Sequence, residues 1–283
     1  MSRSDAGKLA EWRSIGARRS EQTVELATKI LASGNVGDQE WALREQLAIA
    51  ALDMGRIKLA SDQIETLHAK FPNSPRVRIL DGLRLEADED FVRAKAVYED
   101  LLKEDETNVT AHQRLISLSL PSSSAIPLLL SYLDTFYSDP AAWSVLADLY
   151  CEKGLYSQAL TALGHIAIIS NWDDGVIRRS GEVAYTMGDY QLALKYFLRA
   201  AEMQGGKDNN SNTSRTRTWW GIKLTITRLL NSPNVNTSVP QDIRTTEKQL
   251  KDLDVLATER LLAAKGKGID VRRQMLGEMV SNR

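Results

Sequence analysis

Two stretches of this chain, GLYSQALTALGHI at residues 154–166 and GDYQLALKYFLRA at residues 188–200, share one pattern at a spacing of 34 residues. In both, a glycine opens the stretch, a tyrosine follows two residues later, and an alanine is followed by apolar residues four and seven positions on. Residues at these intervals lie on one face of an α-helix, and the small alanine lets a neighbouring helix approach closely. The same helix recurs along most of the chain, with its alanine at Ala60, Ala94, Ala125, Ala159 and Ala193.

A second pattern precedes these alanines and predicts a partner helix. Before Gly154, the residues Trp143, Leu146, Ala147 and Tyr150 share one helical face. Each repeat is therefore a helix-turn-helix unit, which buries its apolar face only by stacking on copies of itself. This length and pattern are those of the tetratricopeptide repeat, and they predict an all-α, superhelical solenoid.

The repeat pattern also divides the chain. We expect capping helices over residues 1–36, because the ends of a solenoid need a polar outer face, and tandem tetratricopeptide repeats over residues 37–204. Residues 205–214 are rich in Gly, Asn and Ser and have no apolar periodicity. We therefore expect a polar loop over residues 205–218. Repeat-like helices are expected over residues 219–264 and a weakly ordered tail over residues 265–283.

Composition narrows the possible partners and compartment. With 36 basic and 37 acidic residues, the formal net charge is -1, so nothing general favours binding to nucleic acid or to an anionic membrane. The single cysteine, Cys151, excludes an intrachain disulfide framework and suits a reducing compartment. No stretch approaches 18 uncharged apolar residues and the first residues lack the core of a secretory signal, so we expect exposure to the cytosol.

The sequence offers little that would support chemistry. The histidines His68, His112 and His165 lie far apart, none at zinc-ligand spacing, and the Gly205-Gly206-Lys207 stretch follows a helix and lacks the remaining residues of a phosphate-binding loop. Acidic clusters such as residues 88–90 and 173–174 fall at repeat junctions, where carboxylates cap helix N-termini. We predict no catalytic residues, no metal and no cofactor.

Charged residues that project from the first helices are the candidate partner contacts. On the inner curve of a solenoid such charges would contact a charged peptide or loop of a partner, and they are Arg44, Arg78, Arg114, Asp148, Arg178 and Glu182. Trp219 and Trp220 are further candidates, because adjacent residues on a helix point about 100° apart and cannot share one buried stripe.

Several strings resemble a known family. They are ALDMGR at residues 51–56, FPNSPRV at residues 71–77 and DPAAW at residues 139–143, within a match from about residue 37 to about residue 230. They resemble subunit 2 of the endoplasmic-reticulum (ER) membrane protein complex. The resemblance implies a non-catalytic scaffold at the cytoplasmic face of the ER membrane, which binds integral and soluble subunits of that complex and contacts the membrane only through them. It also implies a role in inserting tail-anchored and multi-pass proteins.

Two other functions compete with this one. A tetratricopeptide co-chaperone or adaptor that captures acidic peptide tails needs Lys and Asn at set first-helix positions to clamp carboxylates. Those positions hold neither residue in any repeat; the pairs are Glu45/Ile49, Ile79/Leu83, Thr110/Arg114, Ser144/Asp148 and Arg178/Glu182. An enzyme would instead need titratable groups clustered in one groove of the concave face.

Overall fold

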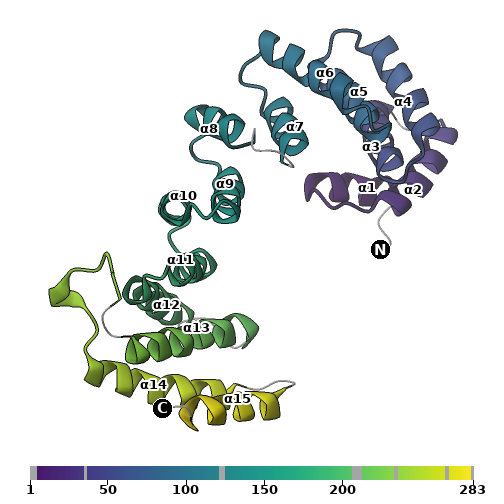
Figure 1. The fold of residues 1–283 in the computed structure, drawn as a ribbon. Helices are drawn as coiled ribbons and strands as arrows, with labels where there is room; N and C mark the ends of the chain where they lie inside the picture. The colour runs from purple at the N-terminus through teal and green to yellow at the C-terminus, as the bar shows by residue number, and fades with distance from the viewer. Residues whose placement is uncertain are drawn as a thin grey trace. The chain divides into compact units, whose positions relative to one another are not determined.

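The computed structural model describes residues 5–34, 37–120, 125–205, 212–232, 235–264 and 268–281. In these ranges the chain forms fifteen α-helices and two short 3-10 helices, with no strand. The all-α prediction is confirmed. The helices fall into two compact units, Met1–Thr135 and Phe136–Arg283, each coloured continuously along the chain in Figure 1.

Unit 1 is a stack of antiparallel helix pairs in which each helix packs on the next in chain order. A capping pair comes first, and its Leu9 and Ala27 pack against Leu47 of the following helix. The helices are α1 (Asp5–Ser14), α2 (Ser20–Ala32), η1 (Gly37–Gln39), α3 (Glu40–Asp53), α4 (Ile57–Lys70), α5 (Pro75–Ala87), α6 (Phe91–Glu104), α7 (Val109–Ser119) and α8 (Ala125–Thr135).

Unit 2 continues the same design, and its helices α13 and α14 are longer than those before them. Its largest core cluster joins α11, α12, α13 and α14 around Phe197. The helices are α9 (Pro140–Glu152), α10 (Tyr156–Ile169), α11 (Asp174–Met187), α12 (Tyr190–Gly205), α13 (Asn212–Asn231), η2 (Gln241–Ile243), α14 (Glu247–Ala263) and α15 (Ile269–Ser281).

The alanines that define the repeat all lie where second helices pack. Each is fully buried, as the spacing predicts: Ala60, Ala94, Ala125, Ala159 and Ala193. The small residues of the first helices are equally constrained. A Cβ added to Gly82 would lie 2.5 Å from the ring of Tyr98, and one added to Gly181 would lie 2.9 Å from the ring of Phe197. Close helix crossing therefore depends on a small residue on one helix facing an aromatic ring on the other.

Helix ends follow the capping chemistry expected from the sequence. The carboxylates of Asp90 and Asp173 accept hydrogen bonds from backbone N–H groups at the starts of α6 and α11. The turn between first and second helices needs left-handed backbone, which Gly188 supplies with φ 90°. Glu89 takes that conformation in the second repeat, with φ 61°.

The predicted polar loop is shorter than expected. Helix α13 begins at Asn212, so residues 212–218 are helical and the boundary after residue 218 is wrong. The polar start of α13 is held against the preceding helix. Thr218 is buried and accepts a hydrogen bond of 3.0 Å from the Gln204 side chain of α12. Residues 206–211, including Gly206 and Lys207, lie outside the described part of the chain.

Within the predicted tail over residues 265–283 the structure describes one helix, α15, whose apolar residues also gave the sequence the option of a short helix on a partner. Leu276 is buried against the preceding helix. The Arg272 guanidinium donates to the carbonyls of Leu261 and Ala264 at 2.9 and 2.8 Å, which satisfies acceptors that the end of α14 leaves open. Residues 265–267 lie outside the described part.

Candidate partner-binding grooves

A groove of about 340 Å³ lies in unit 2 between the first helices α11 and α13, above α12. Phe197 of α12 forms its floor, and Trp220 and Leu224 of α13 form one wall. The groove exists because Gly221 lets α13 approach the floor: a Cβ at this position would lie 2.6 Å from the Phe197 ring. We call this site the α11–α13 groove.

Glu182 of α11 provides the charge at the opposite wall. Its two carboxylate oxygens accept from Nε and one terminal nitrogen of Arg217 at 2.7 and 2.8 Å, a bidentate pair. Arg178 donates to the same carboxylate at 2.6 Å. Two guanidinium groups therefore share one carboxylate, which leaves the wall with a local excess of positive charge and of hydrogen-bond donors.

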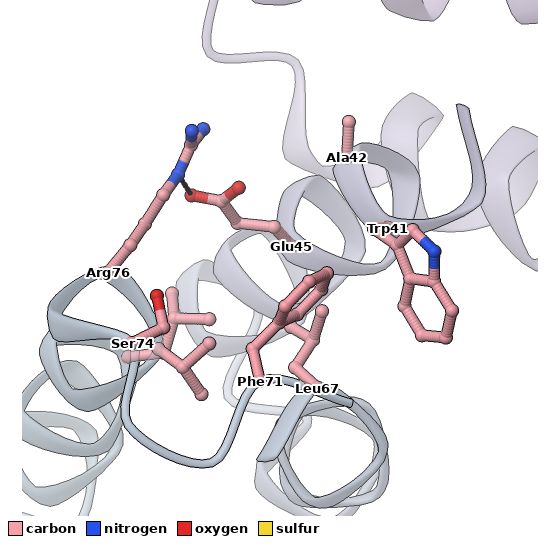
Figure 2. Close-up of a pocket in the computed structure, with 9 residues that line it drawn as sticks. Trp41, Ala42, Glu45, Leu67, Phe71, Ser74 and Arg76 are labelled. Carbon is pink, nitrogen blue, oxygen red and sulfur yellow. Dashed lines mark hydrogen bonds and ion pairs between the residues drawn. The ribbon is translucent and has the colours of Figure 1, made fainter. Parts of the chain in front are cut away.

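A second groove, of about 350 Å³, lies in unit 1 between α3 and α5 (Figure 2). Trp41 and Phe71 contact edge to face, with ring centroids 5.6 Å apart. Figure 2 shows Phe71 between Trp41 on one side and Glu45 with Arg76 on the other. Nε of Arg76 donates to Glu45 at 2.6 Å. This α3–α5 groove repeats the design of the first one, with aromatic rings and an ion pair between successive first helices.

The predicted charged contacts are all paired within the chain. Arg44 binds Glu40 and Gln63, Arg78 binds Glu104 at 2.5 Å, and Arg114 binds both carboxylate oxygens of Glu86. Asp148 accepts from Arg179, and Arg178 binds Glu182. The pairs between successive first helices are Glu45 with Arg76, Glu86 with Arg114, Asp148 with Arg179, and Glu182 with Arg217.

The structure gathers only some of the predicted residues. Glu182 and Trp220 line the α11–α13 groove, with Arg178 beside them. Trp219 instead packs against the core cluster of unit 2. Trp41 and Phe71 were missed by the sequence reasoning, although their aromatic side chains at the start and end of one repeat were a signal that could have identified them.

A buried tyrosine fixes one of these pairs. The Tyr98 hydroxyl donates to Glu86 at 2.6 Å. Burial and then this bond raise the pKa of Tyr98, so its phenol stays protonated. Burial is the largest single effect on Arg114 and acts to lower its pKa, but the hydrogen bonds and charges of Glu86 and Tyr98 together outweigh burial and raise it. Tyr98, Glu86 and Arg114 thus form one hydrogen-bonded structural contact between α5, α6 and α7.

His, Cys, Asp and Glu side chains are spread along the described ranges. No group of three or more His, Cys, Asp or Glu residues there is arranged to hold a metal ion. Cys151 is half-buried, and burial raises the pKa of its thiol. Of the helices in those ranges, none is long and apolar enough to cross a bilayer.

Stacked helix pairs with grooves between successive first helices define a tetratricopeptide-repeat protein. The fold matches a solved structure, the C-terminal part of a TPR repeat-containing protein from Cytophaga hutchinsonii, with a TM-score of 0.63 over 90% of this chain and 95% of that one, at 15% identity. No protein-family model matches the sequence.

Curated relatives identify the family. The chain is 31% identical to ER membrane protein complex subunit 2-A of Xenopus laevis over 243 residues, which cover 83% of this chain and 79% of the relative. It is 29% identical over 178 residues to the TPR repeat protein oca3 of Schizosaccharomyces pombe, covering 60% of this chain and 63% of that one. The chain belongs to the family of ER membrane protein complex subunit 2.

Proposed function

We propose that this chain is a non-catalytic scaffold subunit of the ER membrane protein complex, held at the cytoplasmic face of the ER membrane by other subunits. Its partners are both integral and soluble subunits, and its contact with the membrane is indirect. In this function it supports the insertion of tail-anchored and multi-pass proteins. The α11–α13 and α3–α5 grooves each hold an extended segment of a partner.

The observation that carries this proposal is the shared construction of the two grooves. Each has an apolar floor or wall, formed by Phe197 and Leu224 in one groove and by Leu67 and Leu80 in the other. Each also has a fixed ion pair at its side. An apolar side chain of an extended segment would bury against the floor, while the charged wall would hydrogen-bond the segment's backbone.

The same ion pairs weigh against both alternative functions. A peptide clamp needs uncommitted cations, whereas Arg44, Arg78, Arg114 and Arg178 each bind a carboxylate of this chain. A catalytic carboxylate needs an accessible lone pair, whereas the carboxylates of Glu45 and Glu182 each accept hydrogen bonds from an arginine of this chain. Both features favour a fixed interaction surface over capture of acidic tails or over catalysis.

Purification of the tagged chain from its own cells in mild detergent tests the proposal. We expect several integral ER subunits in fixed ratio, with the chain itself released from membranes by carbonate. Recovery of soluble heat-shock chaperones alone would contradict the scaffold function and favour the co-chaperone alternative.

Variants then test the α11–α13 groove. Changing Trp220→Ala together with Leu224→Ala removes one wall, and recovery of at least one subunit is expected to fall about tenfold. Leu155→Ala is the matched control, because Leu155 is 40% exposed and Leu224 is 38% exposed, but Leu155 lies outside the groove. Unchanged recovery with the double variant would remove this groove from the proposal.

A further inference from the structure

One edge of unit 2 exposes three large apolar side chains that neither groove uses. Tyr137, just before α9, is 71% exposed; Ile168, in the last turn of α10, is 80% exposed; and Trp172, between α10 and α11, is 74% exposed. Single exposed apolar residues are normal on a protein surface, but a group that includes two aromatic rings is typical of an interaction site. We call these three residues the apolar edge.

Contacts beneath these residues show that they belong to one edge. The indole of Trp143 donates to the backbone carbonyl of Tyr137 at 2.8 Å, and its ring stacks on His165 with centroids 4.1 Å apart. Ile168 follows His165 by three residues, so it lies on the same side of α10, one turn nearer the helix end. Trp172 follows four residues later. The start of α9, the end of α10 and the start of α11 therefore meet here.

The surroundings of the apolar edge are acidic. From Phe136 to Ile177 the only Lys or Arg is Lys153, which lies at the other end of α9, in the turn to α10. Arg179 of α11 donates to Ser144 near the start of α9, and its charge is paired with Asp148. The same stretch holds five carboxylates, at Asp139, Asp148, Glu152, Asp173 and Asp174. Two of them border the apolar edge directly, because Asp139 and Asp173 are the N-caps of α9 and α11. Their hydrogen bonds from backbone N–H groups fix the positions of these carboxylates.

We propose that the apolar edge is a docking surface for a basic, amphipathic segment of a partner protein, of the kind that flanks the cytoplasmic end of a transmembrane helix. Apolar side chains of such a segment would cover Ile168 and Trp172, and its Lys or Arg residues would meet Asp139 and Asp173. Membrane proteins concentrate Lys and Arg in their cytoplasmic flanks. The carboxylates repel anionic headgroups, so a protein segment fits better than a lipid surface. This partner class rests on the proposed function, which supplies membrane-embedded neighbours.

Binding of a model segment to the full chain tests the surface itself. The probe is a fluorescent 16-residue helical peptide of Leu and Lys, compared with the same peptide carrying Glu in place of Lys. We expect binding of the Lys peptide only, weakened about tenfold or more by Ile168→Ser with Trp172→Ser. Asp139→Asn with Asp173→Asn is expected to weaken it several-fold and to reduce its salt dependence, because Asn keeps the N-caps while removing both charges.

The matched control is Phe91→Ser with Val92→Ser in unit 1, where the two side chains are 54% and 83% exposed. An equal loss of binding in this control, equal binding of the Glu peptide, or no loss with the apolar-edge variant would overturn the proposal. Tighter binding to phosphatidylcholine vesicles with 30% phosphatidylserine than to neutral vesicles would overturn it in favour of lipid.

A photo-crosslinking residue at position 168 then identifies the occupant in the assembled complex. The expected adduct lies in a Lys- or Arg-rich segment next to a transmembrane helix. Co-purification of the complex with no such adduct, or with adducts to lipid only, overturns the docking proposal and leaves the scaffold function intact. Failure of the chain to co-purify with any ER subunit contradicts the scaffold function, and the peptide measurements still decide whether the edge binds.

Discussion

The contact between α13 and α14 depends on a charge pair that water scarcely reaches. Lys223 Nζ lies 2.8 Å from Asp254 Oδ1, with 1% and 11% of the two side chains exposed. Lys223 also donates to Thr258 Oγ1 at 2.8 Å. Replacing Asp254 with leucine leaves a buried ammonium without its counter-charge. The free energy of unfolding should therefore fall by about 3–5 kcal/mol, the usual effect of breaking a buried pair.

The matched double variant separates the charge effect from packing. Lys223→Met with Asp254→Leu removes both charges and keeps apolar volume, so its stability is expected within about 1 kcal/mol of the parent chain, or above it. An exposed pair provides the control: Lys251 and Glu247 are 66% and 74% exposed on the outer side of α14. Glu247→Ala is expected to leave the free energy of unfolding unchanged within the error of the measurement, because exposed ion pairs contribute little to stability.

Urea unfolding followed by circular dichroism gives these differences, with hydrogen exchange of α13 and α14 amides as a local readout because repeat chains can lose helices in steps. A loss below about 1 kcal/mol for Asp254→Leu would refute the reasoning. A double variant as unstable as the single one would also refute it, since packing rather than charge would then dominate.

Two further predictions concern α13 and the segment that follows it. Gly221→Ala brings a methyl group against the Phe197 ring, so it should lower the free energy of unfolding by about 1–3 kcal/mol in urea unfolding and narrow the α11–α13 groove. Gly164→Ala has open space at its Cβ and should be neutral or stabilising in the same urea measurement. Asp189 is buried, which acts to raise its pKa, but hydrogen bonds from Ser238 and Thr237 outweigh burial and lower the pKa below its ordinary 3.8. The charged carboxylate therefore contributes its full stabilisation above pH 3.8, and this stabilisation is lost as the pH falls through the lower pKa of the folded state. The difference in free energy of unfolding between the parent chain and Asp189→Ala should accordingly shrink in acid unfolding below pH 3.8.

The helix pairs were predictable because their signal is local and repeated. An alanine with apolar residues four and seven positions on specifies its helix from a few neighbouring residues, and all five such alanines are buried as expected. The start of α13 was not predictable in this way. Its first residues, NTSRTRT at 212–218, lack apolar periodicity and favour loops, and they are helical where Thr218 and Arg215 bond to Gln204 of the preceding helix.

The pairing of side chains in the grooves could be predicted only in part from the sequence. Glu182 and Trp220 were identified from their helical positions, but the partner of Glu182 is Arg217, 35 residues away. Such a pairing depends on the shift and rotation of one repeat relative to the next. The sequence alone does not give these two quantities. Likewise, nothing in the sequence around Thr237 and Ser238 indicates a distant partner, yet both side chains bond to Asp189, about 50 residues upstream.

The four ion pairs between successive first helices share one direction. The carboxylate always lies on the earlier helix and the arginine on the later one, as in Glu45 with Arg76 and Glu182 with Arg217. Helix α11 shows both halves, with Arg179 directed to α9 and Glu182 to α13. A repeat of this kind has unlike ends, so it can be extended head to tail. A repeat placed the other way round would bring like charges together, so these ion pairs fix the direction in which successive repeats stack along the chain.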